Sequence, residues 1–96
     1  MFIININYVA PLEKIDAQMK AHMAFLNACY LEGLFIASGR KNPRTGGIIL
    51  ARASSKEALT ELMGNDPFVT EGVAEFEIIE FEASQMHPDF KNVFKD

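Results

Sequence analysis

The chain has 96 residues, of which 49% are hydrophobic and 23% are charged, and its formal net charge is −4. This length predicts one domain, and this composition excludes a wholly disordered chain. The negative charge argues against a protein that binds the nucleic-acid backbone, and no apolar run approaches the ~20 residues that span a bilayer.

The first half of the chain predicts a strand followed by a long helix. Residues 2–9 are mostly β-branched or aromatic, and the even-numbered residues up to Tyr8 share one face. Over residues 12–31, apolar side chains recur at three- and four-residue spacing, which is typical of a helix, and Gly33 stops it. His22 lies on or near this apolar stripe.

Two further strands form a predicted hairpin. The apolar segments 34–40 and 47–53 are separated by a short turn that contains Pro43 and Gly46. Because the connection is short, we expect the two strands to pair in antiparallel fashion.

A second helix and a last strand complete the pattern. The helix begins at Ser54, and Glu57 three residues later suits a capping box. Asp66 followed by Pro67 predicts a tight turn or a single helical turn, and the last strand covers residues 73–81.

The order strand–helix–strand–strand–helix–strand predicts an α+β, ferredoxin-like fold. In this fold two helices cover one face of a four-stranded antiparallel sheet. We expect one domain over residues 1–96, with a core over 2–82 and a carboxy-terminal tail over 83–96 that packs on the domain or on a dimer partner.

Large apolar residues occur on both faces of the predicted sheet. Ile48 and Leu50 oppose Ile49, and Ile78 opposes Ile79. Each such side chain left in water forgoes roughly 1.5–3 kcal/mol, and the helices cover only one face. We therefore expect a homodimer whose two sheets face each other as a dimeric α/β barrel.

His22 and Asp66 are the candidate acid/base residues. Imidazole exchanges protons near neutral pH, and a carboxylate on its second nitrogen fixes the tautomer. The alternative for His22 is a packed residue bonded to a backbone carbonyl. The alternative for Asp66 is a helix cap, a role that can coexist with the first because a carboxylate has several acceptor sites.

Ser38 and Arg40 are candidate substrate-binding residues. They lie on the predicted strand face that also carries Ile36, so they are able to point into a pocket and hold an anionic or carbonyl oxygen. For Lys41 and Arg44 we favour a solvated turn.

The remaining chemistry-bearing residues predict no metal and no cofactor, since His, Cys and carboxylates lack metal-ligand spacing. The single cysteine, Cys29, excludes an intramolecular disulfide, and its helical position favours a buried inert thiol. With no pattern of a signal peptide at residues 1–6, we expect a cytoplasmic protein.

Over nearly the whole domain, the sequence resembles the YciI-like (YCII-related) family of the dimeric α/β-barrel superfamily. The features that carry the resemblance are His22, Glu32-Gly33-Leu34, Ala37-Ser38-Gly39, Gly46-Gly47-Ile48-Ile49, Ser55, Glu57, Ala58, Asn65-Asp66-Pro67-Phe68, Gly72 and the tail Phe90-Lys91-Asn92-Val93-Phe94.

The resemblance implies a ferredoxin-like fold, dimerisation through the sheets and an active site built on a histidine–aspartate pair, matched here by His22 and Asp66. We assign substrate binding to Ser38, Arg40 and Phe68. Many members have proline where this chain has Arg40, a departure that alters the charge of the pocket. Relatives include a dehydrochlorinase of aromatic degradation, and muconolactone isomerase shares the wider fold.

These residues support two main hypotheses for function, and a third rests on the fold. The first is a cofactor-independent enzyme of the lyase, isomerase or hydrolase type, in which His22 moves a proton of a small molecule and Asp66 orients it. The alternative is a non-catalytic ligand-binding or regulatory dimeric module. A cofactor-free oxygenase rests on fold analogy alone.

Overall fold

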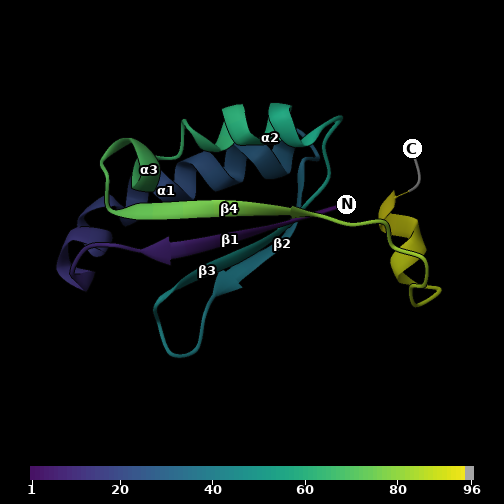
Figure 1. Ribbon diagram of the computed structural model, residues 1–96, viewed down its shortest axis with the longest axis horizontal. Coiled ribbons are helices and arrows are strands. Elements are labelled where there is room, and N and C mark those ends of the chain that lie inside the picture. The colour runs from purple at the N-terminus through teal and green to yellow at the C-terminus, as the bar shows by residue number, and fades with distance from the viewer. Residues whose placement is uncertain (95–96) are drawn as a thin grey trace.

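Four strands form one antiparallel sheet in the computed structural model, which describes residues 1–94 (Figure 1). The strands are β1 (Phe2–Tyr8), β2 (Phe35–Arg40), β3 (Gly46–Ala51) and β4 (Ala74–Glu80), in the order β2-β3-β1-β4 across the sheet. The helices are α1 (Leu12–Leu31), α2 (Lys56–Met63) and α3 (Pro67–Thr70), followed by the short 3₁₀ helix η1 (Phe90–Phe94). This arrangement confirms the predicted ferredoxin-like α+β fold.

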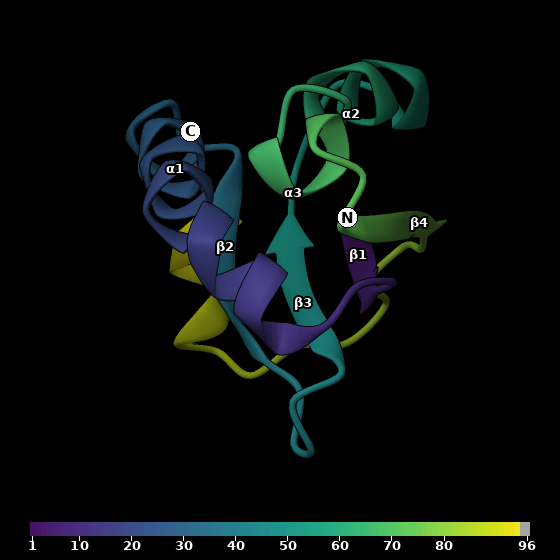
Figure 2. The ribbon, with the colours of Figure 1, turned by 90° about the vertical axis from the view of Figure 1, so that its left-hand side faces the viewer.

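The three α-helices lie on the same side of the sheet: α2 and α3 lie above the strands in Figure 1, and α1 lies in front of β2 in Figure 2. Helix α1 lies against β2, whereas α2 and α3 lie against β4. The residues of β1 on this side, Phe2, Ile4 and Ile6, are all buried. Each alternates with a residue of the other face, because successive side chains of a strand point in opposite directions.

Within residues 1–94, no α-helix lies on the second face of the sheet. The strand register places Ile3 beside both Leu50 and Ile79 on this open face. The side chain of Ile79 is 49% exposed, and Asn5 on the same face donates a hydrogen bond of 2.9 Å to Glu77. Apolar side chains therefore occur on both faces of the sheet, as predicted, and no helix of the described part of the chain covers the second face.

Two local predictions about these elements are wrong. Helix α2 is capped by Ser55, whose side chain accepts a hydrogen bond from the backbone of Ala58, so the proposed Ser54–Glu57 capping box does not form. The two adjacent serines offered two starting points, and the sequence pattern alone did not distinguish them.

The second correction concerns β2, where the register shifts between Phe35 and Ala37. The register pairs Phe35 with Ala51 and Ser38 with Ile49. The strand face that carries Ser38 therefore also carries Phe35, and not Ile36 as predicted. The extra residue of a β-bulge breaks the two-residue alternation on which the prediction rested.

The tail extends beyond the end of the sheet (Figure 1). Arg52, which follows β3, donates to the carbonyl oxygen of Val93 at 3.2 Å and so connects the tail to the body. The packing predicted for residues 83–96 also concerns residues 95–96, which lie outside the described residues. No helix within residues 1–94 is long and apolar enough to cross a membrane.

Candidate functional site

His22 and Asp66 meet although 44 residues separate them in the sequence. The Nδ1 atom of His22 lies 2.8 Å from Oδ1 of Asp66, a distance that makes a strong hydrogen bond. Asp66 is fully buried and the His22 residue is 7% exposed. A carboxylate cannot donate when ionised, so Nδ1 carries the proton of this bond.

The carboxylate is held by its position at the start of α3. Oδ1 of Asp66 also accepts the backbone N–H of Phe68 at 3.0 Å, and Pro67 occupies the first helical position. The predicted helix-cap role is thus confirmed, and one oxygen serves both the cap and the histidine. The other oxygen, Oδ2, is buried and has no hydrogen-bond partner among residues 1–94.

Phe68 fixes the plane of the imidazole. The two rings stack with a centroid distance of 3.8 Å and an interplanar angle of 4°. Tyr8 in turn packs edge-on against Phe68, at 5.9 Å and 90°. With Nδ1 bonded to Asp66, Nε2 is the ring nitrogen of His22 that is available to a molecule in the adjoining cavity.

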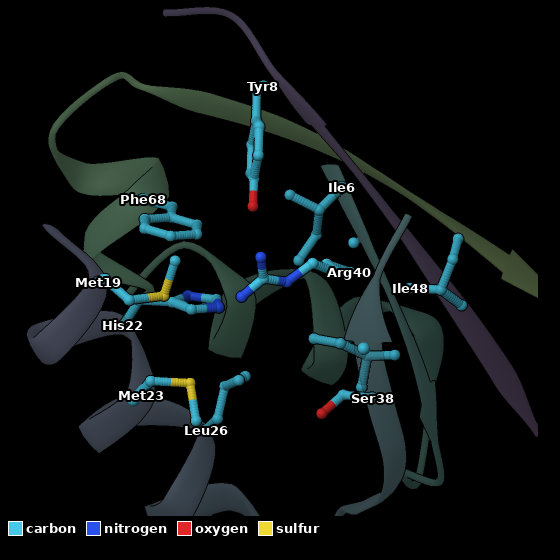
Figure 3. A pocket seen from close by; sticks show the side chains of 13 residues that line it. Ile6, Tyr8, Met19, His22, Met23, Leu26, Ser38, Arg40, Ile48 and Phe68 are labelled. Atoms are coloured by element: carbon cyan, nitrogen blue, oxygen red, sulfur yellow. The ribbon is translucent and has the colours of Figure 1, made fainter. Parts of the chain in front are cut away.

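That cavity has a volume of about 180 Å³ and lies between α1 and the sheet (Figure 3). Most of its wall is apolar. The apolar wall residues include Ile6, Met19, Met23, Leu26, Ile49 and Phe68. The polar side chains that reach it are those of Tyr8, His22, Ser38 and Arg40. Four of the five predicted site residues therefore line one cavity, and the fifth, Asp66, lies behind His22.

Arg40 extends from the end of β2 into the cavity (Figure 3). Within residues 1–94, no hydrogen bond or ion pair engages its guanidinium. The hydroxyl of Ser38 lies 2.7 Å from the hydroxyl of Tyr30 on α1. If Tyr30 donates, the Ser38 hydroxyl keeps its own proton for a ligand.

Tyr8 is a site residue that the sequence analysis did not select. Its hydroxyl points into the cavity from the end of β1 (Figure 3). The signal was available: Tyr8 continues the helix-facing row of Ile4 and Ile6, and it is the member of that row with a polar tip.

Arg44 lies in the β2–β3 turn, for which a solvated position is predicted, and its guanidinium donates an exposed hydrogen bond to Asp16 on α1. This hydrogen bond lowers the pKa of Asp16 and raises the pKa of Arg44, with a further contribution to Arg44 from Tyr8. The β2–β3 turn is thereby attached to α1 beside the cavity.

Neither a metal nor a reactive thiol is indicated by the side chains. Within residues 1–94, no group of three or more His, Cys, Asp or Glu side chains is arranged to hold a metal ion. Cys29 is buried, and burial raises the pKa of its thiol to about 11, with smaller contributions from Glu32 and Asp66. The thiol is therefore almost entirely protonated at neutral pH.

Comparisons with known proteins agree on the fold. The model of the YCII-related domain matches residues 1–82. Among solved structures, the chain is similar to 5-chloro-2-hydroxyhydroquinone dehydrochlorinase (TftG) from Burkholderia phenoliruptrix AC1100, in complex with 2,5-dihydroxybenzoquinone. The TM-score is 0.70 at 19% sequence identity, over 85% of this chain and 94% of that one. The comparison with curated proteins gave no match.

Proposed function

Because this chain belongs to the family of YCII-related domains, we propose that it is a cofactor-independent enzyme in which His22 and Asp66 move a proton of a small molecule. The observation that carries the proposal is the buried 2.8 Å hydrogen bond between Nδ1 of His22 and Oδ1 of Asp66, at the wall of a cavity. The reaction is an elimination, an isomerisation or a hydrolysis.

In this proposal Nε2 of His22 accepts a proton from the substrate and later returns one. Asp66 holds the imidazole with Nδ1 protonated, so Nε2 has the lone pair that a general base needs. When Nε2 takes a proton, the carboxylate stabilises the positive imidazolium. The stack with Phe68 keeps the ring in one plane, which limits the orientations from which the proton moves.

The predicted substrate-binding residues are all at the cavity. Phe68 supplies apolar surface and supports His22, while Ser38 and Arg40 supply hydrogen-bond donors from β2. Such donors stabilise negative charge that develops on a substrate oxygen.

Proton exchange tests the acid/base role without the natural substrate being known. The structural neighbour is a dehydrochlorinase in complex with 2,5-dihydroxybenzoquinone, which is a cyclic dione, so the enolisable cyclic dione cyclohexane-1,2-dione is a suitable probe. We expect the protein in D₂O to exchange the C–H protons beside its carbonyl groups faster than buffer does, as followed by proton NMR. His22→Gln should reduce the catalysed rate by about 10²–10⁴-fold.

His87→Gln is the matched control, because His87 lies in the tail with its side chain 73% exposed. It should leave the exchange rate unchanged. An exchange rate equal to that of buffer, or one that His22→Gln leaves unchanged, would contradict the proposed reaction. Tight binding of a probe without exchange would favour the ligand-binding module instead.

We also propose that two chains pair through the open face of the sheet. Its apolar residues include Ile79 and Ile48, which are 49% and 40% exposed. Asn5 on the same face has a buried Oδ1 with no hydrogen-bond partner within residues 1–94. Burial of apolar groups against a second copy removes them from water.

Light scattering after size exclusion tests this assembly. We expect twice the chain mass of 10.7 kDa for the wild type and the monomer mass for Ile79→Lys. Leu31→Lys is the control, since Leu31 is 90% exposed at the end of α1 and lies outside the sheet. A monomeric wild type would exclude the dimer.

A further inference from the structure

We infer that the cavity binds a planar organic anion of about one ring, with a charged oxygen held between the guanidinium of Arg40 and the hydroxyl of Tyr8. The inference rests on the function proposed above and adds the charge and size of the substrate. It assigns Tyr8 to substrate binding and makes Arg40 the residue that selects for charge.

The charge of the cavity is the first argument. Within the described residues that line it, Arg40 is permanently charged and no carboxylate is present. Asp16 is an acidic group whose pKa Arg40 lowers, and its carboxylate already bonds Arg44. An unpaired guanidinium beside apolar walls attracts an anion, because an oxygen ligand gains charge-assisted hydrogen bonds there.

The position of Tyr8 is the second argument. The hydroxyl of Tyr8 and the guanidinium of Arg40 point into the same part of the cavity (Figure 3). The edge-on contact with Phe68 fixes the phenol ring, so the hydroxyl is already oriented before a ligand arrives. A phenol donates one hydrogen bond to an oxyanion, and a preoriented donor stabilises negative charge most effectively.

The size of the cavity is the third argument. Drug-sized molecules occupy pockets of about 300–1,000 Å³, and this cavity has about 180 Å³. Its walls include the flexible thioethers of Met19 and Met23, which adapt to a ring. A single ring with one or two oxygen substituents fits these limits.

Arg40 lies opposite His22, so its positive charge is able to stabilise an oxyanion that forms when His22 removes a proton. For an enolisable ring ketone, Nε2 of His22 takes the proton from the carbon beside the carbonyl. The electrons of the broken C–H bond form a C=C bond, and the carbonyl π electrons move to the oxygen. The resulting enolate oxygen is held by Arg40 and Tyr8, so the contacts that select an organic anion also stabilise the negative charge that forms in this step.

Matched pairs of acids and amides test this inference by binding alone. The probes are benzoate and benzamide, picolinate and picolinamide, and 2-furoate and 2-furamide, titrated by ligand-observed NMR at pH 7.5. We expect the wild type to bind each acid at least ~10-fold more tightly than its amide, which is about 1.4 kcal/mol. Arg40→Gln should remove the preference, and Arg40→Lys should retain part of it because the charge remains.

Lys41→Gln is the matched control, since it removes the neighbouring positive charge. The Lys41 ammonium donates to Oδ1 of Asn7 at 2.7 Å, and Asn7 lies on the open face of the sheet. This variant should keep the full preference for the acids. Tyr8→Phe should weaken binding of the acids several-fold and leave the amides unchanged.

Three results would overturn the inference: equal binding of acid and amide by the wild type, no binding of any acid at millimolar concentration, or an Arg40→Gln variant that still discriminates. Circular dichroism and thermal melting establish that each variant is folded. Because the assay measures binding and not turnover, its failure leaves the proton-exchange result untouched. If the protein does not catalyse proton exchange but still prefers the acids to the amides, only the proposed reaction is contradicted.

Discussion

Within residues 1–94, two histidine–aspartate pairs occur in opposite surroundings. His22 and Asp66 belong to different elements and are buried, with 2.8 Å between Nδ1 and Oδ1. His87 and Asp89 are two residues apart in the tail, with side chains 73% and 93% exposed and 3.7 Å between Nδ1 and Oδ2. The same two residue types thus occur once inside the fold and once in water.

The difference shows that geometry and burial, and not residue identity, make an acid/base pair. In the tail, both side chains are largely exposed and water screens the two charges, so the pair contributes little. In the interior, the low dielectric strengthens the hydrogen bond, and the α3 cap and the Phe68 stack restrict both side chains.

Removal of the buried carboxylate should have the largest effect on stability. Asp66→Ala removes the cap of α3, worth ~0.5–2 kcal/mol, and leaves the buried Nδ1–H of His22 without an acceptor, which costs ~1–3 kcal/mol. We expect the free energy of unfolding in urea to fall by about 2–4 kcal/mol. Asp89→Ala should change it by less than ~0.5 kcal/mol. Equal losses would mean that burial does not distinguish the pairs.

The two neutral histidines should carry their protons on different nitrogens. Nδ1 of His22 donates to Asp66, whereas Nδ1 of His87 accepts the backbone N–H of Asp89 at 3.1 Å. The neutral tautomers are therefore Nδ1–H for His22 and Nε2–H for His87. Long-range ¹⁵N–¹H NMR at alkaline pH measures both, with His22→Gln and His87→Gln for assignment. An Nε2–H tautomer at His22 would contradict the proposed general base.

The buried thiol of Cys29 should make the stability of the fold depend on pH in the alkaline range. The thiol of Cys29 has an ordinary pKa of 9.0, and burial raises it to about 11 in the folded chain. Between these values the unfolded state loses its proton and the folded state keeps it, so stability falls as the pH rises from 9 to 11. Cys29→Ala should lose less stability over this range in urea titrations. Parallel pH profiles for the two proteins would exclude this cause.

The smallest effect is expected for the exposed ion pair on the cavity rim. Arg44 lowers the pKa of Asp16 below its ordinary 3.8, so the bond stabilises the fold above that pH and is lost as the pH falls through the lowered value. Asp16→Asn should lower the Tm slightly at pH 7, and the difference should shrink as the pH falls below 3.8. High salt should also abolish the difference, because exposed charges are screened. A difference in Tm that persists in acid would exclude the ion pair as its cause.

Local sequence patterns are sufficient to predict the order of the elements and the residues that carry chemistry. Alternation in β1, helical spacing in α1 and the Asp66-Pro67 start of α3 are local signals, because they depend on neighbours within a few residues. Those signals predicted the ferredoxin-like fold. The β2 bulge and the choice of Ser55 as cap were missed, since each depends on a hydrogen bond formed only in the folded chain.

The positions of the site residues relative to one another depend on tertiary packing. His22 and Asp66 lie 44 residues apart, and their contact forms because α1 and α3 pack on the same face of the sheet. The register of β2 then decides that Ser38 and Arg40 face this cavity, and the end of β1 adds Tyr8. A sequence specifies which groups are available, but the distances and burial that control their chemistry arise when distant segments pack together.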